Sequence, residues 1–567
     1  MPGESVTGED TEDVMARHKV ISNKRQQKSK PDLLTDVSQL MELGLHIAVT
    51  IYMLLMIVVL PFYFTDGYAG IGTDKFNFFY KGTCMLGIFF LLFWILYLVT
   101  KVGILNREGG ISRIKQELMQ GYKKLSVTDW FVLGYGVIVV LSYLFSEYKA
   151  GTDFGDAFIG VNRWYLGLRT QLLLVAIYFA ISRFWKRNKW LPALAIPVTL
   201  IIFTLGYLNR FEVRFFEMKN TTNEFISTIG NMNWYCGYMV IIFFGGLYYL
   251  WRMAEEKAWV NAVLGVWMTM GFATLVTQGS RSGLVTLVVM LLVLYLFSMK
   301  STEKLLLFFA CCMSLGFACM VTCVARSFLP ERFNYEDGLT DLLTYSPMAF
   351  VFLAVACLIC LLLAFLQKKG KHSVKAFTIL GYVGCVGVVL ALIIFVVLGL
   401  INTAHPGSLG KLSEVSVLTF NKEWGSYRGA TWAAGFQCFA DQGFLGKLFG
   451  VGPDSMALYL HSNAGEELTA MLKECFKGKT LTNAHCEWLT VLVNNGLLGM
   501  ICYADLFVSA VVRFLKAGKT NALAGACGFA VLAYIVNNMF SFQQAMSAVT
   551  VFMVLGMGET YVRSKKL

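Results

Sequence analysis

Apolar runs long enough to cross a lipid bilayer follow one another along most of this 567-residue chain. A membrane-spanning helix needs about 20 predominantly apolar residues, with a usual range of about 17–25. Fourteen runs meet this length, which predicts an all-α polytopic integral membrane protein with about 12–14 transmembrane helices. The predicted spans are 43–65, 79–100, 127–146, 167–184, 190–208, 234–251, 258–277, 283–299, 303–325, 347–367, 376–401, 486–512, 521–538 and 544–562.

The composition agrees with a membrane protein and excludes most other classes. Hydrophobic residues make up 56% of the chain and charged residues only 15%, and the mean hydropathy is +0.60. A soluble domain carries about 25% charged residues, so a water-soluble core, a disordered chain, collagen and a coiled coil are excluded. The formal charge of +12 requires no nucleic-acid partner, because polytopic membrane proteins concentrate lysine and arginine in their cytoplasmic loops.

Lysine and arginine alternate in abundance from loop to loop, which sets the orientation. The basic loops are 101–126, 183–189, 252–257, 300–304, 368–375 and 513–519. Because cytoplasmic loops carry the excess of positive charge, we expect both termini in the cytoplasm. The predicted division is a cytoplasmic basic tail over 1–42, transmembrane helices 1–11 over 43–401, an extracytoplasmic loop over 402–485, and transmembrane helices 12–14 with a second cytoplasmic tail over 486–567.

The predicted outer loop, residues 402–485, is much longer than the other connections. Loops of this length without secondary structure of their own are uncommon and are usually functional. Two apolar stripes recur in it at helical spacing, first Trp432, Phe436 and Phe439, then Leu468, Met471 and Leu472. We therefore expect two short amphipathic helices along the membrane surface, separated by a glycine turn at 450–453.

Two arginines on the predicted outer face are candidates for binding an anion. Arg281 joins two apolar runs almost without a loop, which places a guanidinium at the membrane boundary. Arg428 opens the first loop helix, where backbone N–H groups favour anions and a guanidinium matches two phosphate oxygens at once. Simpler interpretations stay open, namely an interfacial anchor for Arg281 and a solvated loop residue for Arg428.

One histidine is a candidate for acid–base chemistry. Of the six histidines, His485 alone lies at an outer-face junction between loop and helix, with the acidic Glu487 two residues further on. Imidazole titrates near neutrality and can take a proton from a hydroxyl nucleophile. A structural role is the simpler alternative, but His485 together with Arg281 and Arg428 describes a site for a diphosphate and a hydroxyl.

Four stretches, in this order, resemble the O-antigen ligase and polymerase family of membrane glycosyltransferases, within residues 155–560. They are Gly230–Trp234 with Gly237, Ser280–Gly283, the run from Arg428 through Trp432, Phe436 and Gly446 to Gly450–Pro453, and Ala484–Leu489 continuing to Asn495–Gly499. Arg163 with Gly167 and Leu168 is similar to a weaker upstream motif. The chain departs from the family in an enlarged region around 303–401 and in Cys486, which replaces a polar residue.

The resemblance implies glycan transfer at the outer face of the bacterial cytoplasmic membrane. The implied donor is a glycan on undecaprenyl diphosphate, and the implied acceptor is a hydroxyl of a glycan, lipid or protein, with membrane lipids as further partners. Arg281 and Arg428 would hold the leaving diphosphate, and His485 would position or deprotonate the acceptor for attack with inversion. The implied substrate-binding residues are Arg163, Asn231, Asn233, Ser280 and Glu487.

The resemblance also implies a reaction that uses no metal and no cofactor. In agreement, no predicted outer loop holds a tight Asp-x-Asp cluster of the kind that divalent cations require. The fourteen cysteines lie mostly inside apolar runs, where cysteine behaves as a small hydrophobic residue, and they show no repeated CxxC spacing.

Two questions of function stay open in the sequence. A ligase and a polymerase of this family share the donor and differ in the acceptor, and no motif separates them. A lipid-linked oligosaccharide flippase is the alternative from a different class, because it also binds a diphosphate and has many spans. A transporter is typified by ionisable residues near the midplane of several spans and by inverted repeats, whereas the candidate residues here gather on one face.

Overall fold

The computed structural model describes residues 33–188, 190–253, 258–335 and 338–564, so most of the predicted basic tail lies outside the described residues. Within these ranges a helix covers each of the fourteen predicted spans. Twelve helices of the described chain are long and apolar enough to cross a membrane, while α5 and α19 are shorter, with 17 and 16 residues. The protein is an all-α polytopic membrane protein, which confirms the predicted fold class.

The helices over the predicted spans are α2 (Leu33–Leu54, continued by η1, Leu55–Val59, and η2, Leu60–Phe62), α3 (Ile71–Lys123), α4 (Val127–Phe145), α5 (Leu168–Phe184), α6 (Trp190–Asn209), α7 (Met232–Met253), α8 (Ala258–Thr277), α9 (Arg281–Ser298), α10 (Thr302–Phe328), α12 (Met348–Lys368), α13 (Lys375–Ala404), α18 (Glu487–Gly518), α19 (Ala522–Asn537) and α20 (Ala545–Arg563). Between α10 and α12 lie η3 (Pro330–Arg332) and α11 (Gly338–Thr344). Two short antiparallel hairpins pair β1 (Gly155–Asp156) with β2 (Gly160–Val161), and β3 (Phe225–Ile226) with β4 (Gly230–Asn231).

Two helices extend further than the apolar pattern predicts. α2 begins at Leu33, inside the predicted tail, and α3 runs on through the basic stretch that the sequence suggested as a loop. Helical conformation is interrupted in α3 only at Gly109 and Gly110. The prediction missed these extensions because it followed hydrophobicity, and a polar sequence can form a helix without an apolar run.

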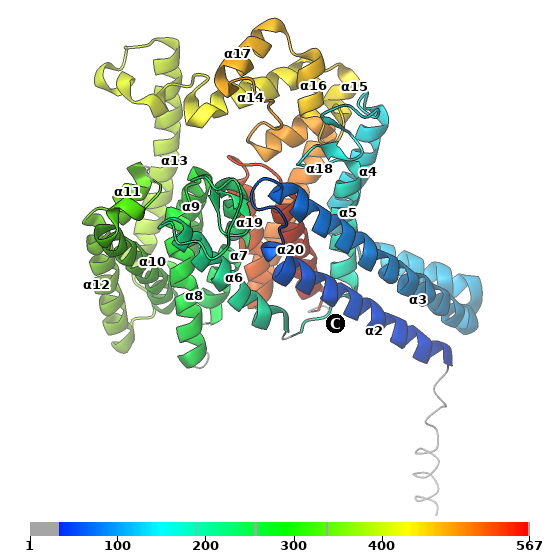
Figure 1. The fold of residues 1–567 in the computed structure, drawn as a ribbon. Coiled ribbons are helices and arrows are strands. Elements are labelled where there is room, and N and C mark those ends of the chain that lie inside the picture. The colour runs from blue at the N-terminus through cyan, green and yellow to red at the C-terminus, as the bar shows by residue number, and fades with distance from the viewer. Residues whose placement is uncertain (1–32, 189, 254–257, 336–337, 565–567) are drawn as a thin grey trace, which may run out of the picture. The chain divides into compact units, whose positions relative to one another are not determined.

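The described chain divides into two compact units, residues 33–48 with 87–124 and residues 49–86 with 125–564. Every predicted site residue lies in the second unit. At the centre of that unit α19 packs against α7, α18, α20 and α9 (Figure 1). These central helices therefore form the frame on which the outer connections are held.

The long loop forms a small helical layer at one end of this bundle (Figure 1). Its elements are η4 (Gly410–Glu414), η5 (Ser416–Leu418), α14 (Trp424–Asp441), α15 (Phe444–Phe449), α16 (Met456–Asn463) and α17 (Glu466–Phe476). The two predicted amphipathic helices correspond to α14 and α17, and the glycine turn at 450–453 lies between them.

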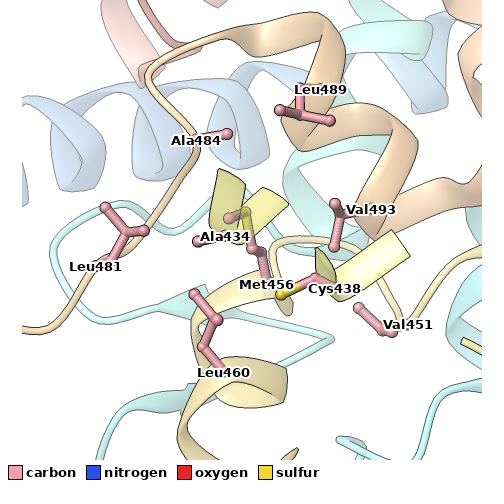
Figure 2. Packing of buried hydrophobic residues seen from close by; sticks show 9 residues of the cluster. All are labelled: Ala434, Cys438, Val451, Met456, Leu460, Leu481, Ala484, Leu489 and Val493. Carbon is pink, nitrogen blue, oxygen red and sulfur yellow. The ribbon is translucent and has the colours of Figure 1, made fainter. Parts of the chain in front are cut away.

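An apolar core inside this layer joins the loop to the start of α18 (Figure 2). Its buried members are Ala434, Cys438, Val451, Met456, Leu460, Leu481, Ala484, Leu489 and Val493. Trp432, Phe439, Leu468 and Leu472 of the predicted stripes pack against this core, whereas Phe436 is 58% exposed. The stripes thus cover a core of the loop itself, which also holds the chain next to His485.

The helix α18 is broken close to its start. At Gly496 the backbone adopts φ +66° and ψ −173°, a conformation that favours glycine. The break leaves the carbonyls of Val493 and Asn494 free to accept the N–H groups of Val451 and Gly452, at 3.1 Å and 2.9 Å. A Cβ atom at Gly496 would lie 2.4 Å from the backbone of α15. The glycine turn of the loop is therefore attached to the outer part of α18 by backbone hydrogen bonds.

Candidate active site

His485 lies in a tight turn just before α18. Its backbone has φ +48°, and its N–H donates to Oδ1 of Asn483 at 3.0 Å. The neighbouring Ala484 is fully buried, its N–H donates to the Thr490 hydroxyl, and its carbonyl accepts the Thr431 hydroxyl at 2.9 Å. This turn is fixed from both sides, by α14 and by the first turn of α18.

The imidazole of His485 is neutral at pH 7. Burial and the nearby charge of Arg428 lower the pKa of His485 to about 4. The ring stands edge-on to Phe542, with 5.1 Å between the centroids. Its Nδ1 atom is buried and has no hydrogen-bond partner in the described part of the chain. A neutral ring keeps a nitrogen lone pair that can accept a proton.

Arg428 follows a short left-handed turn within α14, where Ser426 and Tyr427 have φ values of +61° and +66°. Its guanidinium is held by backbone carbonyls. Nε and Nη2 both donate to the carbonyl of Phe540, at 3.1 Å and 2.7 Å, and Nη1 donates to the carbonyl of Gly425 at 2.7 Å. Carbonyl dipoles orient the guanidinium without cancelling its charge.

Arg281 is the first residue of α9 and its side chain is exposed. Burial and the charge of Arg281 together lower the pKa of Arg428 below its usual value, so the two guanidiniums are close enough to repel one another. Arg428 in turn acts on His485. Arg281 of α9 is therefore near Arg428 of α14, and Arg428 is near His485 in the turn before α18.

The turn that precedes α9 is fixed by buried polar groups. Arg210 is fully buried and donates to the carbonyl of Gln278, and burial lowers the pKa of Arg210 to about 10. The hydroxyl of Tyr335 donates to the carbonyl of Gly279 at 2.7 Å. The side chain of Gln278 bonds both backbone polar groups of Ser280, at 2.7 Å and 2.6 Å. These contacts set the position from which Arg281 extends.

Three of the predicted substrate-binding residues lie next to this turn. The hydroxyl of Ser280 donates to Oδ1 of Asn233 at 2.8 Å and also contacts the hydroxyl of Ser282. Oδ1 of Asn231 accepts the N–H of Asn233 at 2.9 Å, where β4 leads into α7. Arg163 is exposed, in a left-handed conformation with φ +75°, in the loop after β2. Asn233 thus contacts both Ser280 and Asn231, while Arg163 comes from a separate loop.

The fifth predicted substrate-binding residue, Glu487, is 1% exposed. One carboxylate oxygen accepts the hydroxyls of Tyr503 and Tyr534, and the other accepts Tyr534 at 2.9 Å and the side-chain amide of Asn538. The carboxylate is thus enclosed by protein donors between α18 and α19. These partners could not be predicted, because Tyr503, Tyr534 and Asn538 belong to no motif in the sequence.

A polar cavity of about 30 Å³ lies beside the His485 turn, lined by Asn483, Glu487, Asp454, Phe542 and Gln543 among others. A cavity of that volume has room for one or two water molecules. Oδ2 of Asp454 accepts two backbone N–H groups of the loop that carries Arg163, at 2.8 Å and 3.0 Å. Burial raises the pKa of Asp454 to about 7. Sequence reasoning missed Asp454, which follows the glycine turn without a motif of its own.

The segment 538–544, between α19 and α20, is a second part of the site that sequence reasoning missed. It supplies the Phe540 carbonyl to Arg428 and the Phe542 ring to His485. Among the described residues, no group of three or more His, Cys, Asp or Glu side chains is arranged to hold a metal ion.

A family model matches part of the chain. Residues 338–504 match O-antigen ligase. The matched stretch is less than a third of the chain and includes Arg428, the glycine turn and His485, whereas Arg281 lies before it. The match confirms the resemblance to the O-antigen ligase and polymerase family, and it supports an enzyme of this type in a multi-pass membrane protein. No curated protein matches the chain in sequence.

Proposed function

We propose that this protein transfers a glycan from undecaprenyl diphosphate to an acceptor hydroxyl, with inversion and without a metal ion. The reaction takes place at the outer face of the bacterial cytoplasmic membrane, where the loop 402–485 lies, and both termini lie in the cytoplasm. The observation that carries this proposal is that Arg281 lies near Arg428, whose guanidinium is held by backbone carbonyls and acts on a neutral His485. Two cations and one proton acceptor are what such a transfer requires.

The proposed step is a single displacement at the anomeric carbon. The acceptor oxygen forms the new bond while the bond from the anomeric carbon to the diphosphate oxygen breaks, and its electron pair goes to the diphosphate. Arg281 and Arg428 stabilise the charge that develops on the leaving group in a poorly hydrated site. His485 takes the proton from the acceptor hydroxyl, and Arg163, Asn231, Asn233 and Ser280 position the donor around the diphosphate.

Donor binding would also adjust the basicity of His485. A histidine with a pKa near 4 is a weak base, and efficient general bases have pKa values close to the working pH. The negative diphosphate beside Arg428 offsets the positive charge that lowers the pKa of His485. The pKa of His485 therefore rises when the donor is bound, which is when a base is needed.

The test is to incubate purified protein in lipid nanodiscs with a glycan on undecaprenyl diphosphate and with candidate acceptors. We expect release of undecaprenyl diphosphate together with a longer or newly attached glycan. Because a general base contributes about 10²–10⁴-fold, His485→Ala should lower the transfer rate by that factor. Movement of the lipid across the membrane without release of undecaprenyl diphosphate would indicate a flippase instead. The acceptor found in the product separates a ligase from a polymerase.

A further inference from the structure

The segment 538–544, here called the connecting segment, holds two catalytic side chains at once. The carbonyl of Phe540 accepts two of the three hydrogen bonds of Arg428, and the ring of Phe542 contacts the ring of His485. The position of this short stretch of backbone therefore contributes to the placement of both the guanidinium and the imidazole.

The first residue of the connecting segment is held by Glu487 at two points. The side-chain amide of Asn538 donates to Oε2 of Glu487, and the N–H of Glu487 donates to the carbonyl of Asn538 at 3.0 Å. Tyr503 and Tyr534 donate to the same carboxylate. All four side chains are less than 2% exposed. The link from Glu487 to the connecting segment thus consists of one bond between buried side chains and one backbone bond.

The far end of the connecting segment joins the same group of polar residues. The Nε2 of Gln543 donates to the hydroxyl of Tyr503 at 3.1 Å, and its Oε1 accepts Gln171 at 2.9 Å. Gln544 donates to the carbonyl of Trp234 at 3.2 Å. Tyr503 therefore bonds both Glu487 and Gln543, and the segment is fixed at its two ends while Phe540 and Phe542 lie between them.

We infer that Glu487 is a positioning residue, which acts through Asn538 and the connecting segment to place Arg428 against the donor diphosphate. This inference rests on the proposed function and assigns Glu487 a role inside the protein instead of a contact with substrate. A carboxylate suits the role because it has about four acceptor positions and no donor hydrogen, so it accepts the Asn538 amide and both tyrosine hydroxyls together. A neutral amide of the same shape lacks this capacity.

The test exchanges donor and acceptor across the link. In Glu487→Gln one carboxylate oxygen is replaced by an NH₂ group, which can only donate. In one orientation this NH₂ group faces the donating amide of Asn538. In the other it faces the hydroxyl of Tyr503, which already accepts a hydrogen bond from Gln543. In Asn538→Asp two carboxylates face each other and repel. In the double variant E487Q/N538D the glutamine donates to the new aspartate, which restores the bond with its polarity reversed. Each protein is assayed as the full chain in nanodiscs.

We expect kcat/KM for the donor to fall about tenfold in Glu487→Gln, because a buried donor is left unsatisfied, and to fall further in Asn538→Asp. The double variant should recover most of the loss. Asn538→Ala removes the side-chain bond to Glu487 and the bond from the Asn537 amide, and it leaves both tyrosine donors on Glu487. It should behave like Glu487→Gln and serves if that variant does not fold. Tyr52→Phe is the matched control, because it removes a buried tyrosine hydrogen bond, to Thr83, far from the segment in sequence.

A pH profile separates positioning from a general loss of stability. A displaced Arg428 acts less on His485, so the acid limb of kcat/KM should move to higher pH in Glu487→Gln and return in the double variant. An unchanged kcat/KM and pH profile in Glu487→Gln, or a folded double variant no more active than the single ones, would overturn the inference.

Direct binding of undecaprenyl diphosphate keeps the two proposals apart. If the wild-type protein binds this lipid but transfers no glycan, the proposed function fails, and the inference is then decided by whether Glu487→Gln weakens binding and the double variant restores it. If the wild-type protein neither transfers nor binds, both proposals fail. Transfer by the wild type with no effect of the variants overturns the inference alone.

Discussion

Arginines are held in different ways at the two ends of the helix α18. At its C-terminal end, Nη1 of Arg513 lies 2.6 Å from Glu559, and Arg563 bridges Glu559 and Asp129 at 3.0 Å and 2.7 Å. Both acids are buried. At the N-terminal end, the hydrogen bonds of Arg428 go to backbone carbonyls. One end pairs charge with charge, and the other pairs charge with dipoles.

The difference separates a structural cation from one that can still bind an anion. Carboxylates offset the charge of their arginines at this end. The group ties α4, α5, α18 and α20 together and offers little to a substrate; its members are Asp129, Glu559, Arg183, Arg513 and Arg563. Carbonyl groups hold the direction of a guanidinium and leave its net charge in place. An anionic ligand beside Arg428 would therefore be attracted by a charge that its carbonyl partners leave in place.

The largest effect is expected for Arg428→Ala. Removing one group that stabilises the developing charge should lower the transfer rate by about 10²–10³-fold, with little change in Tm because no carboxylate loses its partner. Arg428→Lys should recover little, since an ammonium lacks the planar pair of donors. Transfer rates and thermal unfolding of both variants check this. A large fall in Tm with a normal rate per folded molecule would contradict the comparison.

Arg513→Ala should show the opposite behaviour. The change leaves the buried Glu559 with one cation fewer, and breaking a buried ion pair costs about 3 kcal/mol or more. Thermal unfolding in nanodiscs should therefore show a clear fall in Tm. The transfer rate per folded molecule should stay within about twofold of wild type, and a much larger loss of rate would show that this end of α18 also serves the reaction.

The pH dependence of the reaction tests the free charge of Arg428 without a mutation. Burial and Arg428 hold the pKa of His485 near 4 in the free protein, and a bound diphosphate should raise it. The acid limb of kcat/KM, which reports the free protein, should thus lie near pH 4, and the acid limb of kcat should lie at higher pH. If the acid limbs of kcat and kcat/KM lay at the same pH, the bound donor would not offset the charge of Arg428.

The smallest effect is expected for Asp454→Asn. The Asp454 carboxylate lies at the N-terminal end of α18, like Arg428, and accepts hydrogen bonds from backbone N–H groups. Its pKa is raised to about 7 in the folded protein, above the ordinary value of about 3.9, so the folded state favours the protonated form. Stability should therefore fall as pH rises from about 4 to 7. The amide oxygen of asparagine can accept both N–H groups, so the variant should lose this pH dependence and gain about 2 °C in Tm at pH 8.

The fold was largely predictable because a bilayer imposes a length and a polarity on every span. The polar extensions of α2 and α3 and the packing of the loop stripes were missed, since none of them is visible in hydrophobicity. For the candidate site, Arg281, Arg428 and His485 could be selected because their side chains are of types that can bind an anion or accept a proton. The Phe540 carbonyl could not, because every residue has one and only the fold decides which of them meets a guanidinium.

The break at Gly496 separates two parts of α18 with different surroundings. The part after it, Leu497–Gly518, is about 22 residues long and spans about 33 Å, close to the thickness of a hydrocarbon core. Such a segment tilts when the bilayer becomes thicker or thinner. Tyr503 lies in this segment and bonds both Glu487 and Gln543, so such a tilt would reach the connecting segment. The proposed transfer should therefore depend on the thickness of the membrane.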